Sequence, residues 1–296
     1  MTRATGSEPG VRRTPRPTPR PSARPAARPE CVADCIADSA GGITFDVTGA
    51  AEPGAVLILR RRGGDPAAHP DDEVRLPLTE SAGSRLRAVL PSTVVLAEGH
   101  WDVSTGAAGE RPVRPGSRDV RALVDRTPGP GRIASRVPYP VDAGKLAVRS
   151  WLRAPHAEAG ALRCEPGSAT IEGVLYGAEL GQGAVAEARL RGGKRVHRVP
   201  VTTAGGGAFA FTVPYGPLAA GEVGKRQWWD LWLLPVSGPP DPAAIRISRI
   251  LDDVWDKRAV FVYPSHGDDG WTAVPCYTGD NDLCVRLDPA PVPSRA

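Results

Sequence analysis

The second half of the chain repeats the first, and this internal repeat limits the possible folds more than any other feature of the sequence. Six short blocks recur in the same order, and the two occurrences of each lie 123 to 137 residues apart. The matched blocks are residues 43–50 and 171–178, 55–64 and 184–193, 75–79 and 198–202, 101–102 and 229–230, 118–123 and 246–251, and 145–150 and 282–287. A conserved order at a nearly constant distance predicts two copies of one module.

Each copy has the alternation that is typical of β-strands. Ile43, Phe45 and Val47 alternate with polar residues, which places three apolar side chains on one face of an extended segment. Turn signals follow every 8–14 residues, and the 34 Gly and 32 Pro suit turns better than helix interiors. We therefore predict an all-β protein with two tandem antiparallel β-sandwiches of Ig-like architecture. Only residues 218–224 and 242–253 have patterns compatible with short helices.

The composition also predicts where the domains begin and end. Residues 1–30 alternate Arg with Pro and have almost nothing apolar to bury, so they cannot offset the entropy lost on ordering. The predicted organisation is a disordered tail (residues 1–40), a first sandwich (41–154), a second sandwich (155–290) and a disordered C-terminus (291–296). A linker is expected near residues 154–160, where proteases would cut if the sandwiches were loosely joined.

The charge distribution bears on the partners and the compartment. The formal net charge is +4, but residues 1–30 hold seven Arg and two Glu, so the remainder is nearly neutral. The folded part lacks a positive field, and no nucleic-acid partner is expected. No apolar run of about 20 residues exists, and no secretory signal is recognisable. We expect a cytoplasmic protein, peripheral to a membrane only through partners or the basic tail, with mostly free thiols among its five Cys.

The sequence lacks the recognised patterns of catalytic and phosphate-binding sites, including GxGxxG, the P-loop, GxSxG and HExxH. The expectation is a protein that is not an enzyme and that has no cofactor and no metal. The acidic loops at residues 267–270 and 279–282 are interpreted as turns, because neither has the ligand spacing of a calcium site. One alternative stays open, a hydrolase with its site between the sandwiches, for which the candidate groups are Asp230, Asp252, Asp253, Asp256 and His266.

The candidate binding residues lie in the WWDLWL strand of the second copy. If its alternate positions starting at Trp229 face the core, Trp228, Asp230 and Trp232 face outward. The first copy has His100 where the second has Trp228, so the second module gained outward aromatic residues beside a carboxylate. Grouped aromatic side chains of this kind are typical of binding surfaces. Three alternatives remain at this point: burial under the first copy or a local loop, a partner-protein surface, and a glycan site.

Several longer segments resemble a known family of modules. They are HWDV, WWDLWL, RPVRPGSRDVRALVD, PYPVDAGKLAVRS and YTGDNDLCVRL. Over residues 41–288 the chain resembles the β-sandwich accessory modules of bacterial cell-wall glycosyltransferases and CDP-glycerol glycerophosphotransferases. The resemblance implies a non-catalytic accessory, binding or scaffolding role in surface-glycan transfer. It implies such a transferase, or its glycan product, as the partner, and self-association as a further option. The alternative function is a purely structural protein-interaction module.

Overall fold

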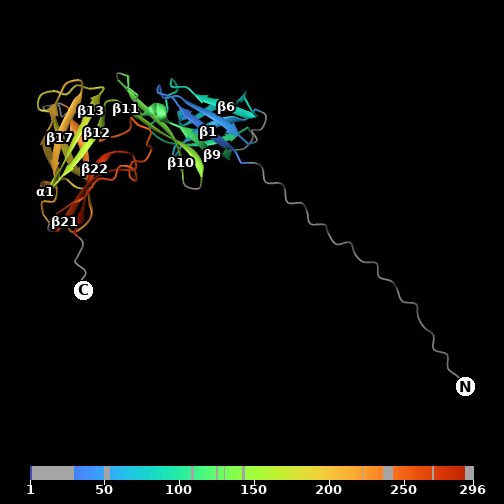
Figure 1. Ribbon diagram of the computed structural model, residues 1–296. Helices are drawn as coiled ribbons and strands as arrows, with labels where there is room; N and C mark the ends of the chain where they lie inside the picture. Colours follow the sequence, from blue (N-terminus) through green and yellow to red (C-terminus); the bar gives the residue numbers. More distant parts are fainter. Residues whose placement is uncertain are drawn as a thin grey trace.

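The described part of the protein is built almost entirely from β-strands, with 56% of the described residues in strands and 4% in helix. The computed structural model describes residues 1, 30–49, 54–107, 110–124, 126–129, 131–141, 144–221, 223–235, 243–268 and 270–290. Most of the predicted N-terminal tail and residues 291–296 lie outside this range. Within it, no helix is long and apolar enough to cross a membrane. The predicted all-β fold is confirmed, and it forms two lobes that lie side by side (Figure 1).

The first lobe contains eleven strands in two sheets. In chain order they are β1 (Val32–Ala37), β2 (Ile43–Thr48), β3 (Val56–Arg61), β4 (Glu73–Pro77), β5 (Thr79–Ser81), β6 (Arg85–Leu90), β7 (Gly99–Gly106), β8 (Arg111–Pro112), β9 (Arg114–Asp119), β10 (Ile133–Val141) and β11 (Lys145–Arg153). Two 3₁₀ turns accompany them, η1 (Pro70–Asp72) and η2 (Arg121–Leu123). One sheet has the order β5-β6-β2-β1-β9, and the other has the order β10-β11-β7-β3-β4 with β8 on β7.

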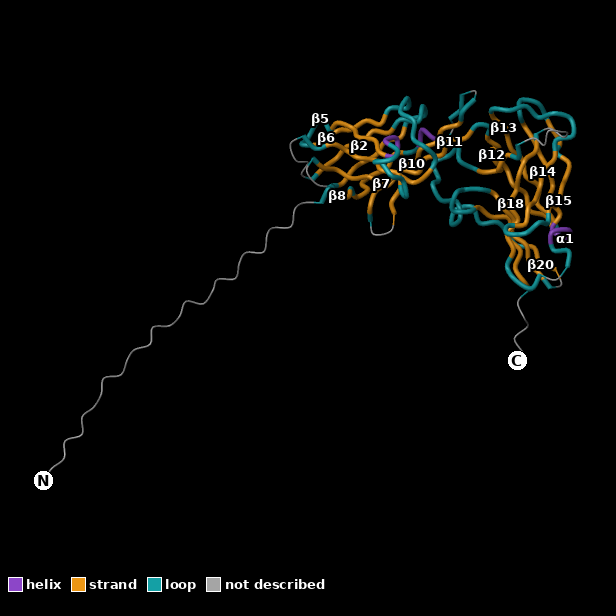
Figure 2. The backbone as a smooth tube through the Cα atoms, turned by 180° about the vertical axis from the view of Figure 1, so that it is seen from behind, coloured by secondary structure: helices purple, strands orange, loops and turns teal. Residues whose placement is uncertain are grey.

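The second lobe repeats this strand order. Its elements are β12 (His156–Glu165), β13 (Ser168–Tyr176), β14 (Val185–Leu190), β15 (Val196–Pro200), β16 (Thr202–Thr203), β17 (Ala208–Pro214), α1 (Tyr215–Leu218), β18 (Gln227–Leu234), β19 (Ile245–Ser248), β20 (His266–Asp268), β21 (Trp271–Tyr277) and β22 (Leu283–Pro289). One layer runs β16-β17-β13-β12-β19 and the other β20-β21-β22-β18-β14-β15, and β19 joins them by pairing with both β12 and β18. Figure 2 shows β12, β13, β14, β15 and β18 together in this lobe.

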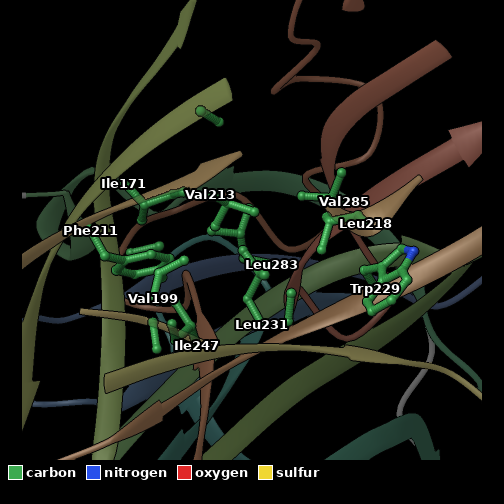
Figure 3. Packing of buried hydrophobic residues seen from close by; sticks show 14 of the residues in the cluster. Ile171, Val199, Phe211, Val213, Leu218, Trp229, Leu231, Ile247, Leu283 and Val285 are labelled. Atoms are coloured by element: carbon green, nitrogen blue, oxygen red, sulfur yellow. The ribbon is translucent and has the colours of Figure 1, made fainter. Parts of the chain in front are cut away.

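Each lobe has its own buried core between its two layers. Trp101 of β7 and Trp229 of β18 are 0% and 1% exposed, and each belongs to the apolar cluster of its own lobe. Leu231 and Leu233 are buried with Trp229, so the predicted register of this strand is correct. Figure 3 shows labelled side chains of this second core, which come from strands of both layers. The core thus fixes which side chains of β18 face outward.

Part of the predicted tail is a strand, which corrects the expected boundary. β1 lies between β2 and β9 in its sheet, and its inward side chains Ala33, Cys35 and Ala37 are at most 2% exposed. Cys31, just before the strand, is also buried. The alternation was overlooked because Ala and Cys contribute little to an apolar pattern. They are small enough to fit where the two layers approach closely.

Truncations should separate the tail from the strand that follows it. Deleting residues 2–29 is expected to leave the midpoint of thermal unfolding nearly unchanged, because this segment has little apolar surface to bury. Deleting residues 2–38 removes an inner strand with its buried side chains, so the first lobe is expected to lose its cooperative unfolding transition. Calorimetry of both variants measures this. Equal stability of the two variants would contradict the placement of β1.

Two further expectations need correction. Of the two segments compatible with short helices, the first contains only the end of α1, a single turn that ends at Leu218, and the described part of the second contains β19. The expected linker is also much shorter, because β11 ends at Arg153 and β12 begins at His156. Residues 156–159 already pair with β13, so their backbone is held in a sheet and is poorly accessible to proteases.

A loop of the second lobe packs into the first lobe. We call residues 249–258 the docking loop. Ile250 is 1% exposed and belongs to the buried cluster of the first lobe, together with Val137 of β10 and Trp151 of β11. Leu251 and Trp255 pack against the same cluster. The lobes therefore share a buried apolar interface, and they are not joined by a linker alone.

The turn between β21 and β22 supplies the polar part of this junction. Asp280 accepts a hydrogen bond from Arg149 at 2.9 Å, and Asp282 pairs with Arg153 at 3.2 Å. Asn281 is fully buried, donates to two carbonyls of the docking loop and accepts from the Lys257 amide. The segment at residues 279–282 is a turn as expected, and its side chains hold the two lobes together.

Candidate functional site

The structure brings the three predicted binding residues together. Trp228, Asp230 and Trp232 lie at alternate positions of β18, on the face opposite to the buried Trp229. All three are partly exposed. In the first lobe, the face of β10 and β11 is covered by the docking loop. Neighbouring side chains of the second lobe cover part of the predicted face, and Arg153 of the first lobe lines a cavity beside it.

Those neighbours are arginines that stack on the indole rings. Each ring has two guanidinium groups within 6 Å of its centroid, the separation at which a cation is attracted to the ring. The distances are 4.9 Å for Arg189 and 5.1 Å for Arg246 over Trp232, and 5.6 Å for Arg191 and 6.0 Å for Arg286 over Trp228. We give the name Trp–Arg face to the two tryptophans, these four arginines and Asp230. Its rings already have partners, which leaves less ring surface for a sugar.

Asp230 is held by the same arginines. Its carboxylate accepts hydrogen bonds from Arg191 at 2.6 Å and from Arg246 at 2.7 Å. Burial by itself raises the pKa of Asp230, but the hydrogen bonds from Arg246 and Arg191 outweigh it and hold the pKa below the ordinary value. Asp230 is therefore ionised at neutral pH. A cavity of about 430 Å³ opens beside Asp230 and Trp232 and is also lined by Arg153 of the first lobe.

The first lobe has an equivalent pair on its own outer face. Arg62 donates to Asp102 at 2.5 Å, and the sequence repeat matches this pair to Arg191 and Asp230. The two arginines are equally exposed, at 47% and 48% of the side chain. The surroundings differ, because the first-lobe pair lines a much larger cavity.

This cavity, of about 840 Å³, lies at the junction of the lobes. The first lobe supplies its floor through β3, β7, β10 and the start of β11, and the second lobe supplies one wall through the docking loop. We call it the junction groove; its principal lining residues are Arg60, Arg62, His100, Asp102, Ser104, Glu110, Tyr139, Lys145, Trp255 and Arg258. Two smaller cavities, of about 550 and 380 Å³, share lining residues with its two ends. The three cavities therefore adjoin one another.

The partly exposed ring of Trp255 forms the aromatic wall of the groove, and Tyr139 behind it is only 2% exposed. Trp255 lies on Tyr139 with 4.4 Å between the ring centroids, and the Tyr139 hydroxyl is 2.6 Å from Nδ1 of His100. Burial, with the positive charges of Arg149 and Arg62, lowers the pKa of His100 below its ordinary value. Burial also raises the pKa of Tyr139. This aromatic group is therefore polar but uncharged at neutral pH.

Carboxylates orient the arginines around this stack. Arg60 lies between Glu73 and Glu110, at 2.5 Å from each, and its side chain remains 39% exposed. Arg62 and Asp102 are about half exposed. The groove thus presents fixed N–H donors and carboxylate acceptors beside an aromatic ring. This combination suits a ligand rich in hydroxyl groups, which both donate and accept hydrogen bonds.

Among the residues considered for a hydrolase, Asp230, Asp252 and Asp256 are paired with basic side chains. Asp252 pairs with Lys257 at 2.7 Å and with Arg249, and Asp256 pairs with Arg258 at 2.6 Å. Among the described residues, no three His, Cys, Asp or Glu side chains are grouped so that they could hold a metal ion. His266 lies in β20, where its ring is near those of Tyr215 and Trp271, with centroids 6.1 and 5.8 Å away.

The groove was missed from sequence because one of its walls comes from an extra segment of the second copy. One feature of the sequence, a change in the offset between matched blocks, indicated this segment. The offset between matched blocks increases from 128 at residues 118–123 to 137 at residues 145–150, so the second copy has nine additional residues between these blocks. Trp255 and Arg258 lie within that longer stretch, and both line the groove. An insertion in the second copy alone therefore indicated that this segment has a role that the first copy lacks.

Comparison with known proteins matches no family model and no curated protein. Solved structures that match part of the chain include TarS of S. aureus, at 12% identity and a TM-score of 0.29, with 62% of this chain and 35% of that chain covered. A pullulanase from Anoxybacillus sp. LM18-11, complexed with maltotriose, has 12% identity and a TM-score of 0.25, with 68% and 24% covered. A Bacteroides uniformis protein described as carbohydrate-binding has 12% identity and a TM-score of 0.18, with 74% and 95% covered.

The chain thus spans about a third of the full TarS chain that it matches, and 55% of a shorter one. TM-scores this far below 0.5 carry no argument about the fold or the function of this chain. The chemistry of the site itself has to support any functional conclusion.

Proposed function

We propose that this protein is a non-catalytic accessory protein that binds a glycan chain in the junction groove and holds it for surface-glycan transfer. The observation that carries the proposal is the groove itself, which combines an aromatic wall with paired arginines and carboxylates and adjoins two smaller cavities. The Trp–Arg face is the alternative location for the same ligand. It stands second because guanidinium groups already occupy its rings.

The dimensions of the groove favour a polymer over a single small molecule. Its central part of about 840 Å³ lies at the upper end of the range of ligand sites. The cavity at one end shares Arg62 and His100 with it, and the cavity at the other end shares Glu110 and Lys145. Several consecutive units of an extended chain would therefore make equivalent contacts along the sheet.

The proposed partner is a glycosyl- or glycerophosphotransferase of cell-wall polymer synthesis, as the sequence resemblance implies. In this scheme the transferase performs the chemistry and the present protein binds the acceptor or product chain. The rigid junction between the lobes supports a binding role, because a groove built from two lobes keeps its shape only when the lobes are fixed.

Titration calorimetry with two probes tests the proposal. Poly(glycerol phosphate) represents an anionic surface polymer and maltoheptaose a neutral glycan. The variant Arg62→Ala/Arg258→Ala removes two exposed arginines from the groove, and exposed ion pairs contribute only about 0–1 kcal/mol to stability, so it is expected to fold. We expect at least tenfold weaker binding of the probe that the native protein binds.

Arg191→Ala is the matched control, since it removes the equivalent and equally exposed arginine of the second lobe. It is expected to leave the affinity within about twofold of the native value. Trp228→Ser/Trp232→Ser addresses the alternative. If that variant abolishes binding while the groove variant does not, the ligand lies on the Trp–Arg face. Absence of binding of both probes at millimolar concentration would contradict the glycan-binding function.

A further inference from the structure

Two cysteines of the second lobe face each other across neighbouring strands. Cys276 of β21 and Cys284 of β22 are directly opposed in the antiparallel register, and their sulfur atoms are 3.5 Å apart. Both are free thiols. They lie beside the Trp–Arg face, because Cys284 is also opposite Asp230 of β18.

The backbone at this position is compatible with a disulfide. Directly opposed residues of an antiparallel pair have Cα atoms about 4.5–5.5 Å apart. Disulfides span Cα separations of about 4.4–6.8 Å. The Cβ atoms of such a pair are about 4.5–5.5 Å apart and those of a disulfide about 3.5–4.5 Å, so the bond needs a rotation of the two side chains and a slight approach of the strands.

The first lobe shows that the fold does not require cysteine at this position. The equivalent cross-strand pair in β10 and β11 is Tyr139 and Ala147. There Trp255 of the docking loop stacks on Tyr139. In the second lobe both members of the pair are cysteine. The two positions have changed together to residues that can form a bond with each other.

The two thiols have different reactivities. Cys276 is partly exposed, and its pKa is lowered first by the hydrogen bond from Cys284 and then by the nearby charges of Arg286 and Arg191. Cys284 is fully buried, and its pKa is raised by its hydrogen bond to Cys276 and by burial. A thiolate is the attacking species in disulfide exchange, so Cys276 is suited to react first and Cys284 to react second.

We infer that Cys276 and Cys284 form a reversible disulfide by exchange with a low-molecular-weight disulfide. The Cys276 thiolate attacks one sulfur of the reagent, a mixed disulfide forms, and one reagent thiolate leaves. Cys284 then loses its proton to solvent and attacks the Sγ of Cys276, which releases the second reagent thiolate. The protein loses two electrons and two protons, and the reagent is reduced to two thiols. This inference is independent of the identity of any ligand.

Oxidised glutathione is the probe for this test, with the native full-length chain. After incubation, blocking of free thiols and digestion with trypsin, residues 259–286 form one peptide, because no Lys or Arg lies between Arg258 and Arg286. We expect this peptide to become lighter by two hydrogen atoms, without blocking groups, and to regain two blocking groups after treatment with a reducing agent.

Cys284→Ala provides the control, because alanine is the residue at the equivalent position of the first lobe. In this variant the second step is impossible, so a glutathione adduct is expected to accumulate at Cys276. Cys164, which is also partly exposed, serves as an internal reference that forms at most an adduct. If the native peptide keeps both thiols while Cys164 reacts, or if it carries only adducts and no internal bond, the inference is wrong.

Discussion

Replacing Trp101 or Trp229 by alanine is expected to lower the free energy of unfolding by about 3–5 kcal/mol. Each indole is at most 1% exposed and lies in the apolar core of its lobe. Each ring nitrogen also donates a hydrogen bond, from Trp101 to the carbonyl of Ala97 at 3.1 Å and from Trp229 to Gln227 at 3.3 Å. The substitution leaves a cavity and removes that bond. Urea denaturation followed by circular dichroism measures the loss.

The outward tryptophans of the same strand provide the comparison. Trp228→Ser and Trp232→Ser each remove two contacts between a cation and a ring, and such contacts contribute about 0.5–1 kcal/mol at exposed sites. Each single change is therefore expected to cost less than Trp229→Ala. If an outward substitution destabilises the protein as much as the inward one, the division of β18 into a core face and an outer face is wrong.

Ile250→Ala is expected to separate the unfolding of the two lobes. The side chain belongs to the second lobe by sequence but is buried in the cluster of the first, so the substitution is expected to cost about 2–5 kcal/mol at the junction. The native protein should unfold in one calorimetric transition because the lobes share this surface. The variant should show two transitions, with the first lobe melting at the lower temperature.

Val262→Ala is the matched control for this prediction. It removes an aliphatic side chain twelve residues further along, where the valine is 78% exposed. Exposed substitutions of this kind usually change stability by no more than about 0.5 kcal/mol. A single, unshifted transition for Ile250→Ala, like that of the control, would mean that the docking loop does not couple the lobes.

Local sequence patterns were sufficient to predict the strands and the orientation of their side chains. In β18 the period of two, anchored by the bulky Trp229, determined which residues face the core, and Trp228, Asp230 and Trp232 face outward as predicted. The same reasoning failed for β1, whose inward residues are only Ala and Cys. Burial there depends on how closely the layers approach, which small side chains do not reveal in a sequence.

Contacts between segments that are distant in the sequence were beyond such local reasoning. Asp230 has two arginine partners that were not predicted. Arg191 lies after β14 and Arg246 lies in β19, and only the folded sheet brings them to Asp230. The junction groove depends in addition on where the docking loop lies. A periodic pattern describes one strand at a time, and it does not say which outer face a distant loop will cover.

The docking loop also has a consequence for the order in which the protein is synthesised. The first lobe is complete in sequence at Arg153, yet Ile250, which belongs to its buried cluster, is added roughly a hundred residues later. At about 5–20 residues per second, the ribosome needs on the order of 5–20 s for that stretch. During this interval Val137 and Trp151 are without the side chain that covers them in the finished protein. The nascent chain therefore passes through a period of exposed apolar surface, which ends only after the docking loop has been made.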